Sequence, residues 1–167
     1  MRQLFGKIVL LISIASASTE LAIAQTTSPA CNNWLVAGDY GFIVQGTKLG
    51  GLGPTGQQFG VTMTHFDPGT GTLQQIDSVT VSGTQLASFS ETPTNGTYSV
   101  NPDCTGSFVL NFTDGRPKVH VNFVVVDNGN EIDTVVIGVV TPATPPGTLT
   151  EGIVSVQSIG KRRFTPL

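Results

Sequence analysis

Charged side chains are scarce in this sequence. Asp, Glu, Lys and Arg together make up 11% of its 167 residues, and the formal net charge is −3. Proteins that bind nucleic acid carry an excess of Lys and Arg to contact phosphates, and this chain has no such excess. Its one basic cluster, Lys161-Arg162-Arg163, is expected to be a solvated strand end. We therefore expect no nucleic acid partner.

Residues that bind metals or carry out covalent catalysis are equally few. The chain has two cysteines and two histidines. Two cysteines without spaced histidines do not complete a structural zinc site, and no C-x-x-C pair predicts redox chemistry. The glycine-rich segment from Gly46 to Gly56 matches neither a dinucleotide-binding nor a phosphate-binding loop, and no G-x-S-x-G motif predicts a serine nucleophile. We expect no metal and no cofactor, and an enzymatic role has no motif to support it.

Long apolar runs are missing except for one near the start of the chain, over residues 8–17. That run is too short to span a bilayer comfortably, follows two basic residues and precedes an A-x-A site at residues 22–24. The pattern predicts a signal peptide over residues 1–24, cleaved before Gln25 or, alternatively, directly after the apolar run. We expect a secreted or periplasmic protein with no transmembrane segment in the mature chain.

The two cysteines lie far apart in the predicted mature chain. Cys31 stands near its start and Cys104 in its middle. Two cysteines in an exported chain predict one disulfide, because the compartments outside the cytoplasm are oxidising. Closing so long a loop stabilises a fold by roughly 4 kcal/mol in the chain-entropy description.

Helical periodicity is absent, and short runs rich in Val, Ile, Thr and Phe alternate with Gly and Pro turns. The expected strands are 34–45, 59–66, 72–82, 96–100 (preceded by a short piece at 86–90), 105–112, 118–126, 131–140 and 150–159. Their even number and short hairpins predict an all-β fold, an eight-stranded, mostly antiparallel up-and-down barrel, with a β-sandwich as the alternative. We assign residues 25–33 to an N-terminal segment and residues 34–167 to a single β-barrel domain. The interior of such a barrel holds side chains or one small ligand.

One hairpin can be interpreted residue by residue. Asn128-Gly129 is a strong type I′ turn signal, and it pairs Val126 with Glu131. One face of the hairpin then carries the apolar series Val121, Phe123, Val125, Ile132, Thr134 and Val136. The other face carries His120, Asn122, Glu131 and Asp133 between Val124, Val126, Val135 and Ile137. The apolar face should point to the core.

The polar face of that hairpin allows two interpretations. His120, Asn122, Glu131 and Asp133 form the one group of histidine and carboxylates that the pattern places on a single surface. If the group lies on the solvent-facing side of an amphipathic hairpin, it has no catalytic role. As the lining of a polar lumen, it could support acid–base catalysis, because burial shifts pKa values.

Three further residues are candidates for the rim of the barrel. His65 shares a face of its strand with Phe59, Val61 and Met63, which predicts a core or rim position. Tyr40 and Tyr98 are expected to pack their rings and to place their hydroxyl groups at the rim.

Three segments carry a resemblance to known proteins: Gly38-Asp39-Tyr40-Gly41-Phe42, the run from Gly96 to Gly106 (G-T-Y-S-V-N-P-D-C-T-G), and Val125 to Glu131 (V-V-D-N-G-N-E). Together they resemble a group of small exported bacterial proteins of unknown function that share a G-x-Y-x-V-N-x-D-C-T-G segment. In architecture the chain is also distantly similar to the barrel of allene oxide cyclases and dirigent proteins. That similarity implies a barrel that binds apolar small molecules, and it carries over no functional residue.

Three functions remain open from the sequence. The first is a non-enzymatic exported barrel that binds a small apolar ligand or serves the cell envelope. The second is an isomerase or cyclase of the allene oxide cyclase or dirigent kind, with Glu131 or His120 inside the barrel. The third is a structural or interaction module that engages a partner, which the sequence does not identify, through its loops or sheet faces.

Overall fold

The computed structural model describes residues 30–50, 53–90, 93–112, 118–140, 149–150 and 154–163. The predicted signal peptide, residues 25–29, the expected turn at 114–117 and the expected loop at 141–147 lie outside these residues. No helix in the described part of the chain is long and apolar enough to cross a membrane.

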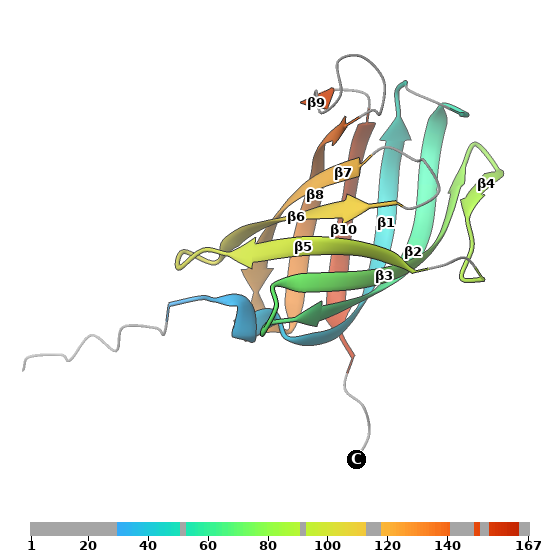
Figure 1. The fold of residues 1–167 in the computed structure, drawn as a ribbon. Coiled ribbons are helices and arrows are strands. Elements are labelled where there is room, and N and C mark those ends of the chain that lie inside the picture. Colours follow the sequence, from blue (N-terminus) through green and yellow to red (C-terminus); the bar gives the residue numbers. More distant parts are fainter. Residues whose placement is uncertain are drawn as a thin grey trace, which may run out of the picture.

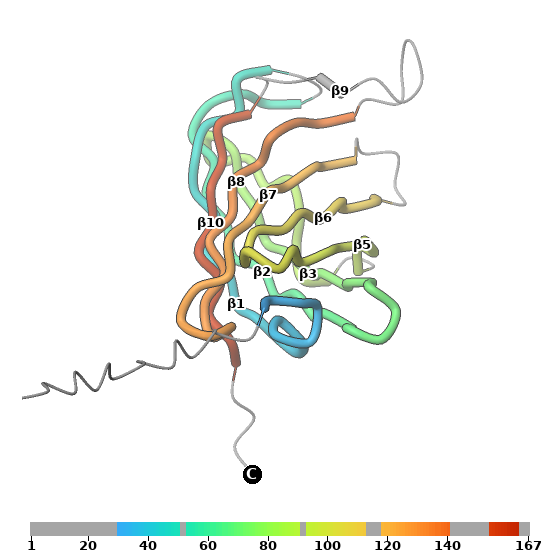
Figure 2. The backbone as a smooth tube through the Cα atoms, turned by 90° about the vertical axis from the view of Figure 1, so that its left-hand side faces the viewer, coloured from blue at the N-terminus to red at the C-terminus, as the bar shows by residue number. Residues whose placement is uncertain are grey.

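The chain forms a closed, antiparallel, eight-stranded β-barrel, which confirms the predicted fold class. Each barrel strand pairs with the next barrel strand along the chain, and the last one closes the barrel by pairing with both the first strand and the strand before it, as Figures 1 and 2 show. The barrel strands are β1 (Gly38–Lys48), β2 (Gly56–Asp67), β3 (Thr72–Val81), β5 (Thr94–Val100), β6 (Thr105–Asn111), β7 (Lys118–Val126), β8 (Glu131–Val140) and β10 (Val154–Arg162). Two short strands, β4 (Thr84–Ala87) on β3 and β9 (Leu149–Thr150) on β8, lie outside this ring.

The structure differs from the expected strands at both ends of the domain. Residues Asn33–Val36 form a 3₁₀ helix, η1, rather than the start of the first strand. The side-chain oxygen of Asn32 caps this helix by accepting a hydrogen bond from the backbone N–H of Trp34 at 2.9 Å. The last strand continues beyond its expected end, to Arg162, because its pairing with β1 extends to Tyr40.

The β7–β8 hairpin has the predicted turn, and its register is the predicted one from Asn122 to Val126. Asn128 and Gly129 have φ values of 51° and 82°, as a type I′ turn requires, and Val126 pairs with Glu131. The 3₁₀ assignment η2 (Asp127–Gly129) covers this turn. The register shifts by one residue between His120 and Val121, so His120 pairs with Gly138.

An aromatic layer crosses the inside of the barrel. Phe66 makes edge-to-face contacts with Tyr40 and Tyr98, at centroid distances of 5.6 and 4.9 Å. Phe108 continues the layer, 6.3 Å from Phe66 and 6.0 Å from Phe123. All of these side chains are at least 94% buried. The side chains of this layer therefore pack continuously across the interior from β1 to β7.

Two glycines make room for this packing. A side chain at Gly160 would overlap the ring of Phe42, and one at Gly106 would overlap the ring of Phe123. Both glycines face the interior, directly opposite residues of the neighbouring strands. Large rings fit inside a narrow barrel because the adjacent strands carry no side chain at these points.

Arg162 closes the end of the barrel that carries η1. The sequence predicts a solvated Arg162 at a strand end, and the structure corrects this: its guanidinium turns inward and donates to the Tyr40 hydroxyl and to the Leu35 carbonyl oxygen. Tyr40 is completely buried and donates in turn to the Gly129 carbonyl oxygen. Lys161 and Arg163, by contrast, are exposed, as expected.

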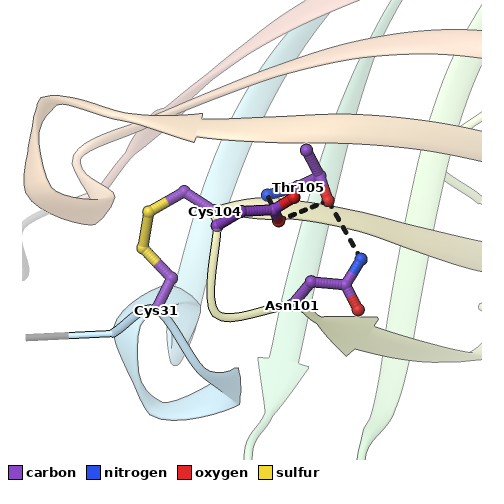
Figure 3. The surroundings of a disulfide bond; sticks show 5 residues. Cys31, Asn101, Cys104 and Thr105 are labelled. Atoms are coloured by element: carbon purple, nitrogen blue, oxygen red, sulfur yellow. Dashed lines mark hydrogen bonds between the residues drawn. A yellow bond between two sulfur atoms is a disulfide. The ribbon is translucent and has the colours of Figure 1, made fainter.

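The predicted disulfide between Cys31 and Cys104 is present, with Cα atoms 5.0 Å apart (Figure 3). It fastens the segment before η1 to the β5–β6 turn, where Cys104 has a positive φ of 68°. Asp103 supports this turn by accepting hydrogen bonds from the backbone N–H and the hydroxyl group of Thr105, at 3.0 and 2.6 Å. The bridge is consistent with an oxidising compartment.

Candidate binding site in the barrel lumen

The barrel interior holds a partly open cavity of about 120 Å³ on the far side of the aromatic layer from η1. A cavity of roughly 150 Å³ lined by apolar side chains can bind benzene, so this space has the size of one small ring. Phe42 also joins the aromatic layer, 6.2 Å from Tyr40 between ring centroids, and both Phe42 and Phe108 line the cavity. The aromatic layer is thus the floor of the cavity.

One wall of the cavity is apolar and comes mainly from β6 and β7. Its residues are Phe108, Leu110, Phe112, Val119 and Val121. Val136, Val156 and Val44 extend this surface around the barrel. These are the inward positions that alternation along β7 and β8 predicts.

The other wall comes from β2 and β3 and is mainly polar, with Val79 as its apolar member. It contains Gln58, Thr62, Gln75 and Asp77. Thr62 lies directly opposite Asp77 in the register of the two strands, and Thr64 lies opposite Gln75. Inward-facing positions on neighbouring strands thus bring two amides, a hydroxyl and a carboxylate together.

Hydrogen bonds fix part of the polar lining. The buried Thr64 hydroxyl donates to the Gln75 side-chain oxygen at 3.0 Å, which sets the orientation of that amide. Across the barrel, the hydroxyl groups of Thr134 and Ser158 are 2.6 Å apart. Polar groups in such a partly enclosed space interact more strongly than they would in bulk water.

Burial also shifts pKa values on the interior face of β1 and on β5. It lowers the pKa of Lys48, which ends the inward series of β1. Burial, with a smaller contribution from the Asp67 carboxylate, raises the pKa of Tyr98 to about 12. Burial likewise raises the pKa of Tyr40, and the Arg162 guanidinium opposes that shift. Both phenols are therefore neutral near neutral pH.

The polar group expected on the β7–β8 hairpin lies on the outer face of the barrel. His120, Asn122, Glu131 and Asp133 alternate with the inward-facing Val121, Phe123, Ile132 and Thr134, and none of the four lines the cavity. The lining of this cavity comes from the apolar face at β7 and β8, so it gives the lumen interpretation of the four residues no support. A catalytic role for the four residues on the outer face stays a prediction.

The outward residues differ in their surroundings. Glu131 forms an ion pair with Lys161 on β10. Asn122 and Asp133 line a shallow outer groove with Ser107 and Val135. One Asp133 carboxylate oxygen is buried there and has no hydrogen-bond partner among the described residues.

The three rim candidates divide into two kinds. Tyr40 and Tyr98 are buried in the aromatic layer, and their hydroxyl groups reach backbone oxygens of Gly129 and Asn33 at the η1 end. His65 is 57% exposed and contacts Asp39 at 2.7 Å on the outer face of β1 and β2. His65 does not lie in the core, because its whole face of β2, including Phe59 and Val61, points outward, and its rim position stays a prediction.

The polar wall is what the sequence analysis missed. Along β2, alternation separates Phe59, Val61 and Met63 from Gln58, Thr62 and Thr64, and the apolar set is the expected core. The residue pattern of the neighbouring strand, β3, does indicate which face points inward. In β3, Asp77 and Gln75 share a face with Leu73, Val79 and Val81, so an apolar core at both ends of that strand already places Asp77 inside.

Comparison of the chain with protein-family models, with curated proteins and with solved structures finds no match. The function is therefore inferred from the barrel and its lumen alone.

Proposed function

We propose that this protein is an exported, non-enzymatic binding protein whose lumen holds one small, mainly apolar molecule. The cavity of about 120 Å³ against the apolar wall of β6 and β7 carries the proposal. Ligand sites are typically concave and mostly apolar, with a few polar groups that fix orientation, and this cavity has that composition.

The proposal includes the domain organisation predicted from the sequence. Residues 1–24 would direct export, and residues 34–167 would fold as one barrel outside the cytoplasm, in the periplasm or the medium. The Cys31–Cys104 disulfide supports this location, since such bridges persist in oxidising compartments. A barrel held at one end by a disulfide and by Arg162 also suits a rigid, pre-formed binding site.

Toluene is a suitable first probe, because it is a single small ring and is as apolar as the side chains of the apolar wall. Toluene is expected to raise the melting temperature of the wild-type protein, because a ligand that binds only the folded state stabilises it. In the variant Val136→Phe a ring fills part of the cavity, and the toluene shift should disappear. Val135→Phe is the matched control: the neighbouring residue faces outward and is 48% exposed, so this variant should respond like the wild type.

A second measurement on the wild-type protein tests the proposal even if the Val136→Phe variant does not fold. Nuclear Overhauser contacts from toluene to the methyl groups of Val121 and the ring of Phe108 are expected in the wild-type protein. Saturating toluene that neither shifts the melting temperature nor contacts these side chains would show that the lumen does not bind apolar molecules.

One observation favours a second candidate, an interaction module that pairs with its own copy. Val61, Ile43 and Ile159 lie side by side in register on the outer face of β2, β1 and β10, and they are 46%, 66% and 48% exposed. This row carries no charge, so it can pack against the same row of a second copy without complementary charges. Ile43→Lys should abolish any dimer seen by analytical ultracentrifugation, and a wild-type monomer at all concentrations would exclude this candidate.

A further inference from the structure

A second concave surface, which we call the η1 groove, lies at the η1 end of the barrel beside the disulfide. Its volume is about 550 Å³, and none of its lining residues lines the lumen cavity. The lining includes Cys31, Asn32, Trp34, Leu35, Cys104 and Asn128. Small-molecule sites typically occupy roughly 300–1,000 Å³, so the η1 groove has room for one small ligand.

Trp34 is the most exposed large apolar residue in the described part of the chain. Its exposed fraction is 71%, whereas Cys31 and Val125, which also line the groove, are 6% and 8% exposed. Tryptophan is a highly buried residue type on average, since its ring gains much from leaving water. The η1 groove therefore has one strongly exposed aromatic ring beside buried neighbours.

The backbone that carries Trp34 is fixed on both sides of that residue. The disulfide lies before it, and the side-chain oxygen of Asn33 accepts a hydrogen bond from the backbone N–H of Val100 at 2.9 Å. After it, the carbonyl oxygen of Leu35 accepts a hydrogen bond from Arg162. A group that is already held in place loses less conformational freedom when it binds. We therefore interpret Trp34 as a pre-positioned binding residue.

Two amide side chains line the same groove. Asn128 lies in the exposed turn of the β7–β8 hairpin, and Asn32 precedes η1. The side-chain oxygen of Asn32 accepts from the backbone N–H of Trp34, and its NH₂ group takes no part in that bond. Amides both donate and accept hydrogen bonds. None of the described lining residues carries a charge, so the groove suits a neutral ligand with an apolar face and hydroxyl groups.

We infer that the η1 groove binds a neutral pyranose sugar, which stacks a C–H face on the ring of Trp34 and hydrogen-bonds through its hydroxyl groups to Asn32 and Asn128. A pyranose ring carries C–H groups on its faces and hydroxyl groups around its edge. The negative face of the indole attracts the weakly positive hydrogens of these C–H groups. The lumen cavity lies on the far side of the aromatic layer, so this inference does not depend on the proposed lumen binding.

A protein partner is the main competitor, because tryptophan is frequent among the residues that dominate protein interfaces. A standard interface buries roughly 800 Å² of each partner, around a cluster of such residues. In the η1 groove, Trp34 is the one strongly exposed large apolar side chain among the described lining residues. A single ring in a groove suits a ring-sized ligand better than a broad protein surface.

The chain has a single tryptophan, so the indole N–H signal in an N–H correlation NMR spectrum reports on this site alone. Methyl glucoside, methyl galactoside and N-acetylglucosamine are titrated into the wild-type protein. Sorbitol supplies hydroxyl groups without a ring, and cyclohexanol supplies a ring with one hydroxyl group. At least one pyranoside is expected to shift the indole signal saturably and to bind at least about tenfold more tightly than sorbitol or cyclohexanol.

Variants test the two kinds of contact, with binding followed by the backbone amide signals of Leu35 and Val125. Trp34→Ala should weaken pyranoside binding at least about tenfold, whereas Trp34→Tyr keeps a flat ring and should bind more tightly than Trp34→Ala. Asn128→Gly keeps the turn, because glycine tolerates positive φ, and should weaken binding about three- to tenfold. Phe59→Ala is the matched control, since it removes an exposed ring on the outer face of β2, and it should bind like the wild type.

Three results would overturn the inference. The first is the absence of a saturable indole shift with all three pyranosides. The second is cyclohexanol binding as tightly as the best pyranoside, which would make the groove a purely apolar site. The third is an indole shift that follows protein concentration without any sugar, which would identify a second copy as the occupant. Trp34→Ala should keep the toluene response of the wild type, so failure here leaves the proposed lumen binding intact.

Discussion

Tyr40 and Arg162 are directly opposite each other on β1 and β10, and their side chains meet inside the barrel. Arg162 donates to the Tyr40 hydroxyl from Nε and from Nη2, at 3.0 and 2.8 Å, and its guanidinium carbon lies 5.4 Å from the centre of the Tyr40 ring. The pair also reaches Gly129 in the β7–β8 turn and Leu35 in η1. One buried phenol and one guanidinium therefore hold four separate parts of the chain together.

Tyr40→Phe should reduce stability although the ring is kept. The variant leaves the Gly129 carbonyl oxygen and the Arg162 donors without the hydroxyl they now bind, and a buried unpaired group costs about 1–3 kcal/mol. Urea unfolding followed by fluorescence measures the loss. Tyr98→Phe is the matched control, since the hydroxyl of Tyr98 makes a longer contact of 3.4 Å to Asn33, and it should cost clearly less. Equal stability of Tyr40→Phe and the wild type would contradict this role.

The fold was largely predictable from local chemistry. Asn128-Gly129 sets the register of the β7–β8 hairpin, because both residues tolerate positive φ, and the apolar face of β7 then has to point inward. Val126 and Glu131 accordingly pair as predicted. The register shift beside His120 was not predictable, because no turn residue marks it. The apolar sequence from Trp34 to Val36 is typical of the start of a strand. In the structure this segment belongs to the 3₁₀ helix η1, which Asn32 caps.

The site was much less predictable, because alternation identifies the core only where the core is apolar. On β7 the rule holds, and Val121 and Phe123 face the lumen. On β2 the lumen is polar, so Thr62 and Thr64 are buried while Phe59 and Val61 face outward. Polar inward positions therefore invert the expected pattern on β2, whereas β3, which also contributes to the polar wall, keeps buried apolar residues on its inward face.

Reduction of the Cys31–Cys104 disulfide should destabilise the barrel by roughly 2–5 kcal/mol, the usual range for native disulfides in exported domains. The bridge spans a sequence separation of 73 residues, so the unfolded chain gains considerable freedom when it opens. Thermal unfolding with and without reductant measures the effect. The double variant Cys31→Ser, Cys104→Ser should melt like the reduced wild type and should not respond to reductant. Free thiols on unreduced, exported protein would show that the bridge does not form.

Stability should fall as the pH rises from about 10 to 12, the interval between the ordinary and the folded pKa of Tyr98. The sign follows from burial: the unfolded state releases the phenol proton near pH 10, whereas the folded state keeps it to about pH 12 and therefore loses stability between the two. Urea midpoints at pH 9, 10 and 11 test this. Tyr98→Phe should have a shallower decline, and the raised pKa of Tyr40 should account for part of the slope that remains. An identical decline in Tyr98→Phe and the wild type would rule out Tyr98 as a cause.

The inverted face of β2 gives the most direct contrast between two phenylalanines on one strand. Phe66 is completely buried in the aromatic layer, whereas Phe59 is 57% exposed on the outer face. Phe66→Ala should cost about 3–5 kcal/mol, because it removes ring contacts with Tyr40 and Tyr98 and leaves a cavity. Phe59→Ala should change stability by no more than about 0.5 kcal/mol, as expected for an exposed site. Denaturant unfolding of both variants measures the two losses of stability. A larger loss of stability for Phe59→Ala would mean that β2 presents its apolar face to the lumen. Thr62 and Gln58 would then lie outside, and the lumen would have no polar wall.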